Sequence, residues 1–234
     1  MQLFYAPDLR GEHHVLDEQE SKHLLRVLRK HIGDTITLTD GKGKFYTGEL
    51  VNEDHRRCEL RITDVKDGSG KRAYHVHIAI APTKNINRFE WFLEKATEIG
   101  IDVIIPLICQ RSERKVIKAE RLNKVITSAM KQSLKAYHPV LNEAMSFNDV
   151  IDSDFTGNKF IAYVEEGEHP LLQSLYKPGE DAIILIGPEG DFSPEEVVKA
   201  KENGFRTVSL GESRLRTETA GVVAVHTIAM LNNE

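Results

Sequence analysis

The sequence predicts an α/β protein in which a small, mainly β module precedes a larger domain built on a parallel sheet. From residue 75 onward, short runs rich in Val, Ile and Ala alternate with helix-like segments, and such uninterrupted apolar runs are typical of strands covered on both faces. Before residue 66 the strand-like segments instead alternate polar and apolar residues between turn signals, as half-buried strands do. The 234 residues suffice for one large domain or two modest ones.

The first module is expected to contain one helix. Asp17-Glu18-Gln19-Glu20 has the form of a capped helix start, because a small acidic side chain precedes acids in the first turn. The residues expected on the buried side of this helix are Leu24, Leu25, Val27 and Leu28.

Strands follow the helix. Asp34 to Thr39 alternates as a half-buried strand does, Asp40 to Gly43 is a strong turn signal, and Phe45 to Val51 is the expected return strand. A further strand is expected from Arg57 to Val65. The polar, glycine-rich stretch from Lys66 to Lys71 then predicts a boundary between a first domain over residues 1–70 and a second over residues 71–234.

The larger domain is expected to alternate strands and helices. Its predicted strands are His75 to Ala81, Val103 to Ile108, Phe160 to Val164, Ala182 to Ile186 and Thr207 to Leu210. A helix from Arg88 to Ile99 should stop at Gly100, with Phe89, Phe92, Leu93, Ala96 and Ile99 on its apolar face. Another helix is expected from about Ala119 to Leu134. The last, Ala220 to Leu231, is apolar apart from His226 and Thr227, so it should lie in the core or at a subunit contact.

Two glycine-anchored loops near the C-terminus carry the strongest functional signal. The first is Gly187-Pro188-Glu189-Gly190-Asp191, and the second runs from Gly211 to Ala220; each follows a strand-like run and precedes a helix. Turns of this kind are where α/β proteins place ligands, and glycine lets a ligand approach the backbone. Ser193-Pro194-Glu195-Glu196 has the form of a helix start, with a serine cap and proline at the first position. The alternative is that the first loop is simply a well-formed strand-turn-helix connection.

The charge around the first loop restricts the kind of ligand. Glu189, Asp191, Glu195 and Glu196 would repel a phosphate, and neither of the glycine-rich nucleotide-binding motifs is present. A ligand with a positive centre and little negative charge fits better.

The second loop supplies positive charge. Arg214 and Arg216 alternate with Ser213 and Leu215, so both should point to one side of an extended loop, where arginine can orient a phosphate or a base of a nucleic acid. The alternative is that Arg216 simply pairs with Glu218 at the surface.

Together these loops resemble the last two sequence motifs of the SPOUT methyltransferases. The spelling G-P-E-G followed by L-G-x-x-x-L-R-x-E-T-A is similar to that of the RsmE branch. The resemblance covers essentially the whole chain and includes Phe4-Tyr5, His23 to Arg29, Gly33-Asp34, Lys84, Glu94 to Gly100, Arg111-Ser112 and Gln132-Ser133.

The resemblance implies a fold and a reaction. The fold would be a C-terminal SPOUT α/β domain with a trefoil knot, preceded by a small PUA-like β-barrel domain. The reaction would be methylation of N3 of a uridine, position 1498, in 16S ribosomal RNA of the small ribosomal subunit by a homodimer that uses S-adenosylmethionine. That methyl donor carries a sulfonium and no phosphate, which agrees with the acid-rich first loop. The cofactor contacts that the resemblance assigns are Ile186, Gly187, Glu189, Gly190, Leu210, Gly211, Leu215, Arg216 and Ala220.

Methylation of uridine N3 requires that its proton leave. A cation that stabilises negative charge on O2 and O4, or a base that accepts the proton, would help. Arg216 is the first candidate for the stabilising role and Glu218 is a candidate for the base. Two positions depart from the family pattern: Asp191 stands where glycine is frequent, and Lys135, after Gln132-Ser133-Leu134, stands where arginine is expected.

RNA contacts are expected from two basic patches. Lys22, Arg26 and Arg29 recur at helical spacing in the first module, although a solvated helix face explains them equally well. Lys84 and Arg88 follow the first strand of the larger domain. Arg111 follows the next strand, in a basic stretch of a kind that is usually just soluble surface.

Composition excludes several classes of protein. The net charge of −5 argues against a protein that coats nucleic acid through overall charge. Only two cysteines, Cys58 and Cys109, occur, which excludes a disulfide framework and fits a reducing cytoplasm. No apolar run approaches the length that spans a membrane. The ten histidines suggest no set of metal ligands, so no metal is expected.

Two other functions stay open. One is a SPOUT methyltransferase acting on tRNA. The other is a non-catalytic RNA-binding or ribosome-assembly factor that keeps the knot. The presence of Gly187, Gly190 and Gly211 argues against the second, because a site no longer in use would tolerate side chains there.

Overall fold

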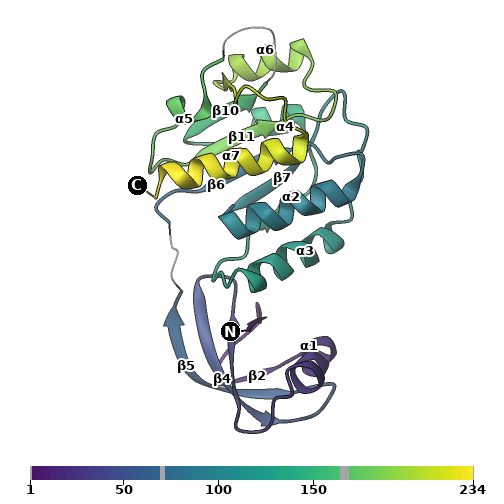
Figure 1. Ribbon diagram of the computed structural model, residues 1–234, viewed down its shortest axis with the longest axis vertical. Helices are drawn as coiled ribbons and strands as arrows, with labels where there is room; N and C mark the ends of the chain where they lie inside the picture. The colour runs from purple at the N-terminus through teal and green to yellow at the C-terminus, as the bar shows by residue number, and fades with distance from the viewer. Residues whose placement is uncertain (1, 69–71, 164–168, 234) are drawn as a thin grey trace. The chain divides into compact units, whose positions relative to one another are not determined.

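A computed structural model describes residues 2–68, 72–163 and 169–233 (Figure 1). Three residues of the predicted linker, 69–71, and the end of one predicted strand, Val164, lie outside the described residues. The chain divides into two compact units, Met1–Lys71 with Thr127–His138, and Arg72–Ile126 with Pro139–Glu234. The assignment of residues 127–138 to the first unit is a feature that a boundary read along the chain could not supply.

The first unit is built on a five-stranded sheet with the order β1-β3-β4-β5-β2. β1 (Leu3–Tyr5) pairs in parallel with β3 (Thr35–Thr39), and β4 (Lys44–Asn52), β5 (Glu59–Asp67) and β2 (His13–Val15) continue it as antiparallel neighbours. Register shifts between β4 and β5 curl the sheet around its core. The buried residues of that core include Phe4, Leu24, Leu38, Leu50 and Leu60.

The helix of the first unit begins where the sequence predicted but changes its winding. Asp17 caps α1 (Glu18–Lys22), since its Oδ1 accepts the Glu20 N–H at 2.8 Å. The chain then continues as a π-helical turn, η1 (His23–Val27). Because a π-turn is wider than an α-turn, the side chains rotate away from a 3.6-residue period. Leu24 is fully buried whereas Val27 is 65% exposed, so the expectation that Val27 lies on the buried side is wrong.

The second unit contains the parallel sheet that the apolar runs predicted. Its strand order is β12-β10-β11-β6-β7-β8, and the short strand β9 also pairs with β7. Every pairing is parallel. The strands are β6 (Val76–Ile80), β7 (Val103–Ile108), β8 (Val140–Leu141), β9 (Met145–Ser146), β10 (Asn158–Ala162), β11 (Ala182–Ile186) and β12 (Arg206–Val208).

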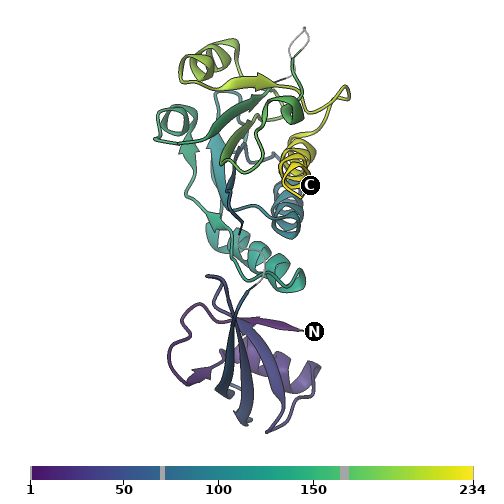
Figure 2. The same cartoon turned by 90° about the vertical axis from the view of Figure 1, so that its left-hand side faces the viewer.

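Helices cover both faces of this sheet (Figure 2). On one face lie α2 (Ile86–Ile99), α5 (Leu172–Leu175), α7 (Thr217–Leu231) and the first part of α3 (Ala119–Gln132). On the other lie α4 (Phe147–Ile151) and α6 (Pro194–Glu202). The alternation along β11 shows the two faces directly: Ile184 packs in the first core, and Ile183 and Leu185 pack in the second.

The three helices expected in this domain have ends within three residues of those predicted. Gly100 ends α2 with φ +128°, a conformation that favours glycine. α7 begins at Thr217, three residues before the expected start. The curled β module and the parallel α/β domain implied by the resemblance are both present; the trefoil knot stays a prediction.

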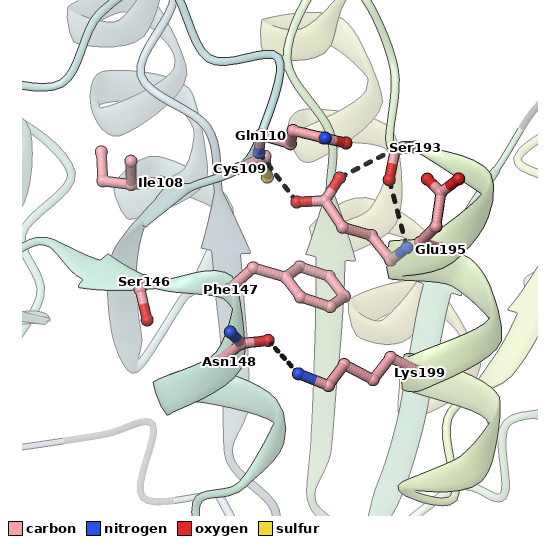
Figure 3. Close-up of a pocket in the computed structure, with 10 residues that line it drawn as sticks. Ile108, Cys109, Gln110, Ser146, Phe147, Asn148, Ser193, Glu195 and Lys199 are labelled. Carbon is pink, nitrogen blue, oxygen red and sulfur yellow. Dashed lines mark hydrogen bonds between the residues drawn. The ribbon is translucent and has the colours of Figure 1, made fainter.

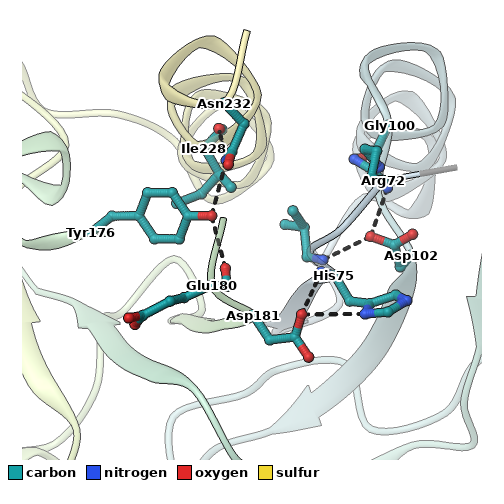
Figure 4. A network of polar contacts seen from close by, with 10 residues as sticks. Arg72, His75, Gly100, Asp102, Tyr176, Glu180, Asp181, Ile228 and Asn232 are labelled. Atoms are coloured by element: carbon teal, nitrogen blue, oxygen red, sulfur yellow. Dashed lines mark hydrogen bonds and ion pairs between the residues drawn. The ribbon is translucent and has the colours of Figure 1, made fainter. Parts of the chain in front are cut away.

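A network of polar contacts fastens the amino ends of the central strands (Figure 4). Asp102 Oδ2 accepts hydrogen bonds from Arg72 Nη2 at 2.6 Å and from the Val76 N–H at 2.7 Å. Asp181 Oδ1 accepts the His75 N–H at 2.7 Å. The hydroxyl of Tyr176 donates to a backbone carbonyl at 2.8 Å and thereby helps to fix the loop that enters β11. This edge is occupied by structural contacts, so the opposite, carboxyl edge is where a ligand site can form.

Candidate functional site at the carboxyl edge of the parallel sheet

Four of the loops that leave the carboxyl ends of parallel strands carry the predicted site residues of this unit. They span residues 81–85 after β6, 109–118 after β7, 187–193 after β11 and 209–216 after β12. The two glycine loops singled out from the sequence are directly joined, because Thr217 Oγ1 donates a hydrogen bond to the carbonyl of Gly187 at 3.1 Å. Thr217 is buried, so this bond fixes the start of α7 against the first loop.

The first loop is a tight turn with an open outer side. The Asp191 N–H donates to the carbonyl of Pro188 at 2.9 Å and closes the turn. A Cβ on Gly187 would lie 3.1 Å from ring atoms of the buried Phe192, so a side chain there would require this ring to shift by a few tenths of an ångström. A Cβ on Gly190 would find no atom nearer than 3.5 Å, the Cβ of Arg111. The fold itself therefore leaves a methyl-sized space at Gly190 that a ligand can use.

Asp191 adopts a left-handed backbone conformation, with φ +60°. Aspartate tolerates this region better than most residues, and its Oδ1 accepts the Phe192 N–H at 2.8 Å. The geometry gives a physical reason why glycine is frequent at this position in the resembling family.

The helix after the first loop begins as predicted. Ser193 caps α6: its Oγ accepts the Glu196 N–H at 3.2 Å, and Glu196 Oε2 accepts the Ser193 N–H at 2.9 Å. Glu196 Oε1 also accepts the Gln110 N–H at 2.8 Å. Because the cap and a carboxylate occupy these N–H donors, this helix start is not arranged to bind phosphate.

A hollow of about 410 Å³ lies beside this helix start (Figure 3). Phe147 and Asn148 of α4 face Glu195 and Lys199 of α6 across it, and Lys199 Nζ donates to Asn148 Oδ1 at 2.8 Å. None of the predicted cofactor residues lines it. The hollow therefore belongs to the packing of α4 against α6 and not to the glycine loops.

The second loop is open and carries an unpaired arginine. Gly211 has φ +130°, and a Cβ there would meet nothing within 4 Å. Arg216 is the exposed N-cap residue of α7, with φ −76° and ψ 156°. Among the described residues its guanidinium has no hydrogen bond or ion pair. A surface pair between Arg216 and Glu218 is therefore not formed.

Glu218 instead faces Arg88. Its side chain is only 9% exposed, and its Oε1 lies 3.9 Å from Arg88 Nε. Glu218 occupies the first turn of α7, where the helix dipole favours a negative charge. Arg88 and Glu218, which lie 130 positions apart in the sequence, are thus brought together at this edge.

The loop after β7 binds two of the other loops, a contact that sequence reasoning missed. Arg111 Nη1 donates to the carbonyls of Gly190 at 2.9 Å and Phe192 at 3.2 Å. Arg114 donates to the carbonyls of Thr83 at 3.0 Å and Lys84 at 2.7 Å. The Nζ of Lys84 pairs with Glu113 at 2.8 Å, and this contact raises the pKa of Lys84.

In the first unit, two of the three predicted basic residues share a groove. Lys22 and Arg26 line a groove of about 680 Å³ together with His23 and the end of α3, at Ser128, Lys131 and Gln132. Arg29 has a left-handed backbone, with φ +53°, and does not line it. Arg26 has no partner among the described residues, whereas Lys22 pairs with Glu18.

Within residues 2–68, 72–163 and 169–233, no group of three or more His, Cys, Asp or Glu side chains could hold a metal ion. No helix in this part of the chain is both long and apolar enough to cross a membrane. Both cysteines are buried, and burial raises the pKa of the Cys109 thiol.

Comparison with known proteins gives consistent matches. A family model described as an RNA methyltransferase domain matches residues 70–229, and one described as an RNA methyltransferase PUA domain matches residues 16–63. The chain is 28% identical to a "Ribosomal RNA small subunit methyltransferase E" of Aquifex aeolicus, over 98% of this chain and 99% of that protein.

Two solved structures extend the match to three dimensions. A probable rRNA-methyltransferase from Porphyromonas gingivalis is 45% identical and superposes with a TM-score of 0.94, covering 100% of this chain and 99% of its own. A ribosomal RNA small subunit methyltransferase E from Neisseria gonorrhoeae, bound to S-adenosyl methionine, is 29% identical with a TM-score of 0.84, covering 99% and 98%.

Proposed function

The chain belongs to the RNA methyltransferase family, and on that premise we propose that it methylates N3 of a uridine, position 1498, in 16S ribosomal RNA in the cytoplasm. The observation that carries the proposal is the pair of glycine loops joined by Thr217 and Gly187, with methyl-sized space at Gly190 and an unpaired Arg216 beside them. The Neisseria gonorrhoeae relative, bound to S-adenosyl methionine, supports this donor.

The residues present fit S-adenosylmethionine. Its sulfonium tolerates the acids around the first loop, and it has no phosphate that would need the capped start of α6. When bound, it supplies a methyl group activated by positive charge on sulfur. We assign its binding to the residues that line the two loops: Ile186, Gly187, Glu189, Gly190, Leu210, Gly211, Leu215, Arg216 and Ala220.

Arg216 is proposed to stabilise charge on the uridine. Loss of the N3 proton spreads negative charge onto O2 and O4, and a guanidinium with free donors can hydrogen-bond both. Arg216 is exposed and has no partner among the described residues, so no existing contact must break when the base arrives. Preorganised donors of this kind contribute roughly 10²–10³-fold to turnover.

Glu218 is proposed as the group that accepts the proton. Its carboxylate is buried at the start of α7 and faces Arg88 at 3.9 Å, a distance longer than a hydrogen bond. Arg88 can therefore hold the carboxylate in place without occupying its lone pairs.

The RNA is proposed to bind through basic residues of both units. Lys22 and Arg26 line the groove of the first unit, and Arg29 lies outside it. In the second unit the proposed contacts are Lys84, on the loop after β6, and Arg88, in the first turn of α2; Arg111, on the loop after β7, donates to backbone carbonyls instead. Each phosphate contact among them makes the affinity for RNA fall with added salt.

A homodimer is part of the proposal. α7 is apolar over almost its whole length, yet Met230 on it is 53% exposed and Trp91 on the adjacent α2 is 43% exposed. A second copy of the chain would cover such side chains.

The test combines cofactor binding with RNA mapping. The protein should bind S-adenosylmethionine in calorimetry, and 16S rRNA from cells lacking it should lack one N3-methyluridine that the intact gene restores. Loss of a methyl group from tRNA, with 16S rRNA unchanged, would replace the proposed substrate. No cofactor binding would favour a non-catalytic RNA-binding factor.

The catalytic assignment needs its own pair of variants. At saturating S-adenosylmethionine, Arg216→Ala should lose about 10²-fold or more in turnover. Arg214→Ala removes the same charge two residues away, from an exposed residue without a partner among the described residues, and should lose much less. Equal losses in the two variants would show a general charge effect and would refute the specific role.

A further inference from the structure

Arg111 and Arg114, although basic and near the surface, donate to backbone carbonyls of the site. Resting on the proposed function, we propose that they are positioning residues that hold the methyl-donor loops in place, and that neither is an RNA contact. Arg111 was expected among the RNA-binding residues from its sequence alone.

Arg111 fixes the first loop through two hydrogen bonds. Its Nη1 lies 2.9 Å from the carbonyl oxygen of Gly190 and 3.2 Å from that of Phe192. One nitrogen therefore donates to two residues in the second half of the loop. Gly190 is the position where the fold leaves space for a ligand. A shift of this guanidinium would move the wall of the proposed donor pocket.

Arg114 and Glu189 extend the connection to the loop after β6. Arg114 Nε and Nη2 reach the carbonyls of Thr83 and Lys84 at 3.0 Å and 2.7 Å. The Lys84 N–H in turn donates to Glu189 Oε1 at 2.9 Å. The contacts form a closed ring: segment 111–114 binds residues 83–84, these bind Glu189, and the turn that contains Glu189 binds Arg111.

The segment that carries both arginines is itself fixed. The Ser112 side chain is buried, and its Oγ accepts the Cys109 N–H at 2.9 Å. The Gln110 N–H donates to Glu196 Oε1 of α6 at 2.8 Å. The arginines therefore project from a rigid base, as a group that positions loops must.

The acceptors of Arg114 explain why this residue is arginine. Arg114 reaches two carbonyls through two different nitrogens, Nε and Nη2, and its fork of N–H donors suits that geometry, whereas Arg111 reaches both of its carbonyls through Nη1. Lysine would keep the charge but would present a single ammonium group. We therefore expect lysine at position 114 to restore only part of the function.

The test separates loop positioning from RNA contact. Arg111→Ala and Arg114→Ala should each weaken S-adenosylmethionine binding at least tenfold, and Arg114→Lys should fall between the wild type and Arg114→Ala. The slope of log affinity for RNA against log salt should not change. Lys115→Ala is the matched control, because Lys115 is exposed in the same segment and has no partner among the described residues. It should bind the donor within twofold of the wild type.

The opposite pattern overturns the proposal. If Arg111 contacts phosphate, Arg111→Ala keeps the donor affinity and lowers the salt slope by about one. Thermal unfolding is recorded for every variant, and the KM for S-adenosylmethionine is compared with the KM for RNA. A rise confined to the donor KM supports loop positioning, and equal rises in both refute it. If the wild type binds no S-adenosylmethionine, the proposed function fails instead.

Discussion

Replacement of Gly190 by alanine tests the donor pocket with the smallest possible change. The added methyl group would lie 3.5 Å from the Cβ and 3.7 Å from the Cδ of Arg111, both ordinary van der Waals distances. Gly190 is also absent from the glycines with positive φ, so alanine can adopt its backbone conformation. The fold should therefore accept the substitution.

The added methyl group should change the stability of the fold and the binding of S-adenosylmethionine in opposite directions. For stability, alanine restricts the unfolded chain and should raise the free energy of unfolding by about 0.4–1 kcal/mol. For binding, a methyl group forced into a filled contact costs roughly 1–3 kcal/mol, which corresponds to about 5- to 150-fold weaker binding. The variant should thus be as stable as the wild type, or more so, and bind S-adenosylmethionine more weakly.

Calorimetric titration with S-adenosylmethionine and thermal unfolding of the same samples measure the two quantities. Gly211→Ala and Gly204→Ala form a control pair, because both have positive φ, +130° and +83°, and open space around the Cβ. Alanine should strain the backbone at either site by roughly 1–3 kcal/mol, but only Gly211 lies on a donor loop. If Gly190→Ala binds the donor within twofold of a wild type that binds it, the placement of the pocket is wrong.

Three further predictions concern the site and the sheet. Thr217→Val leaves the buried carbonyl of Gly187 without its hydrogen bond, so the free energy of unfolding in denaturant titration should fall by about 1–3 kcal/mol and donor affinity should weaken, whereas Thr217→Ser should change neither much. Burial lowers the pKa of His77 below its unfolded value, so the folded state binds fewer protons and loses stability as pH falls from about 7 to about 5. His77→Phe should reduce this decline of Tm with pH. An unchanged decline would show that other groups cause it. Asp191→Ala should cost about 1 kcal/mol because alanine lacks the side-chain hydrogen bond at φ +60°, while Asp191→Gly should be close to neutral; equal losses would contradict the conformational explanation.

The sequence indicated the glycine loops because their signals are local. A glycine, a serine cap and a proline each act within a few residues, and the apolar run that precedes each loop is read in the same window. The Val27 expectation failed because a π-turn obeys no 3.6-residue period, and nothing local announces it. The bond from Arg111 to Gly190 joins residues 79 apart. Such a contact depends on which strands are neighbours in the sheet, and periodicity does not contain that information.

The arginines at this edge differ in whether their side chains already have partners, and this difference distinguishes their roles. Arg111 and Arg114 are bound to carbonyls, so moving either toward RNA would break an existing hydrogen bond, whereas Arg88 is 42% exposed and lies 3.9 Å from the carboxylate of Glu218. The side chains of Arg214 and Arg216 have no partner among the described residues. Of the two, only Arg216 has its backbone fixed by the start of α7. Its carbonyl accepts the Ala220 N–H at 2.8 Å, and its neighbour Thr217 is tied to Gly187. A side chain that stabilises charge developing in the transition state should have free hydrogen-bond donors and a fixed backbone. If it had to break a contact or move during the reaction, the free-energy cost would offset the stabilisation that it provides. Arg216 satisfies both conditions, which is why its removal should lower turnover more than removal of Arg214.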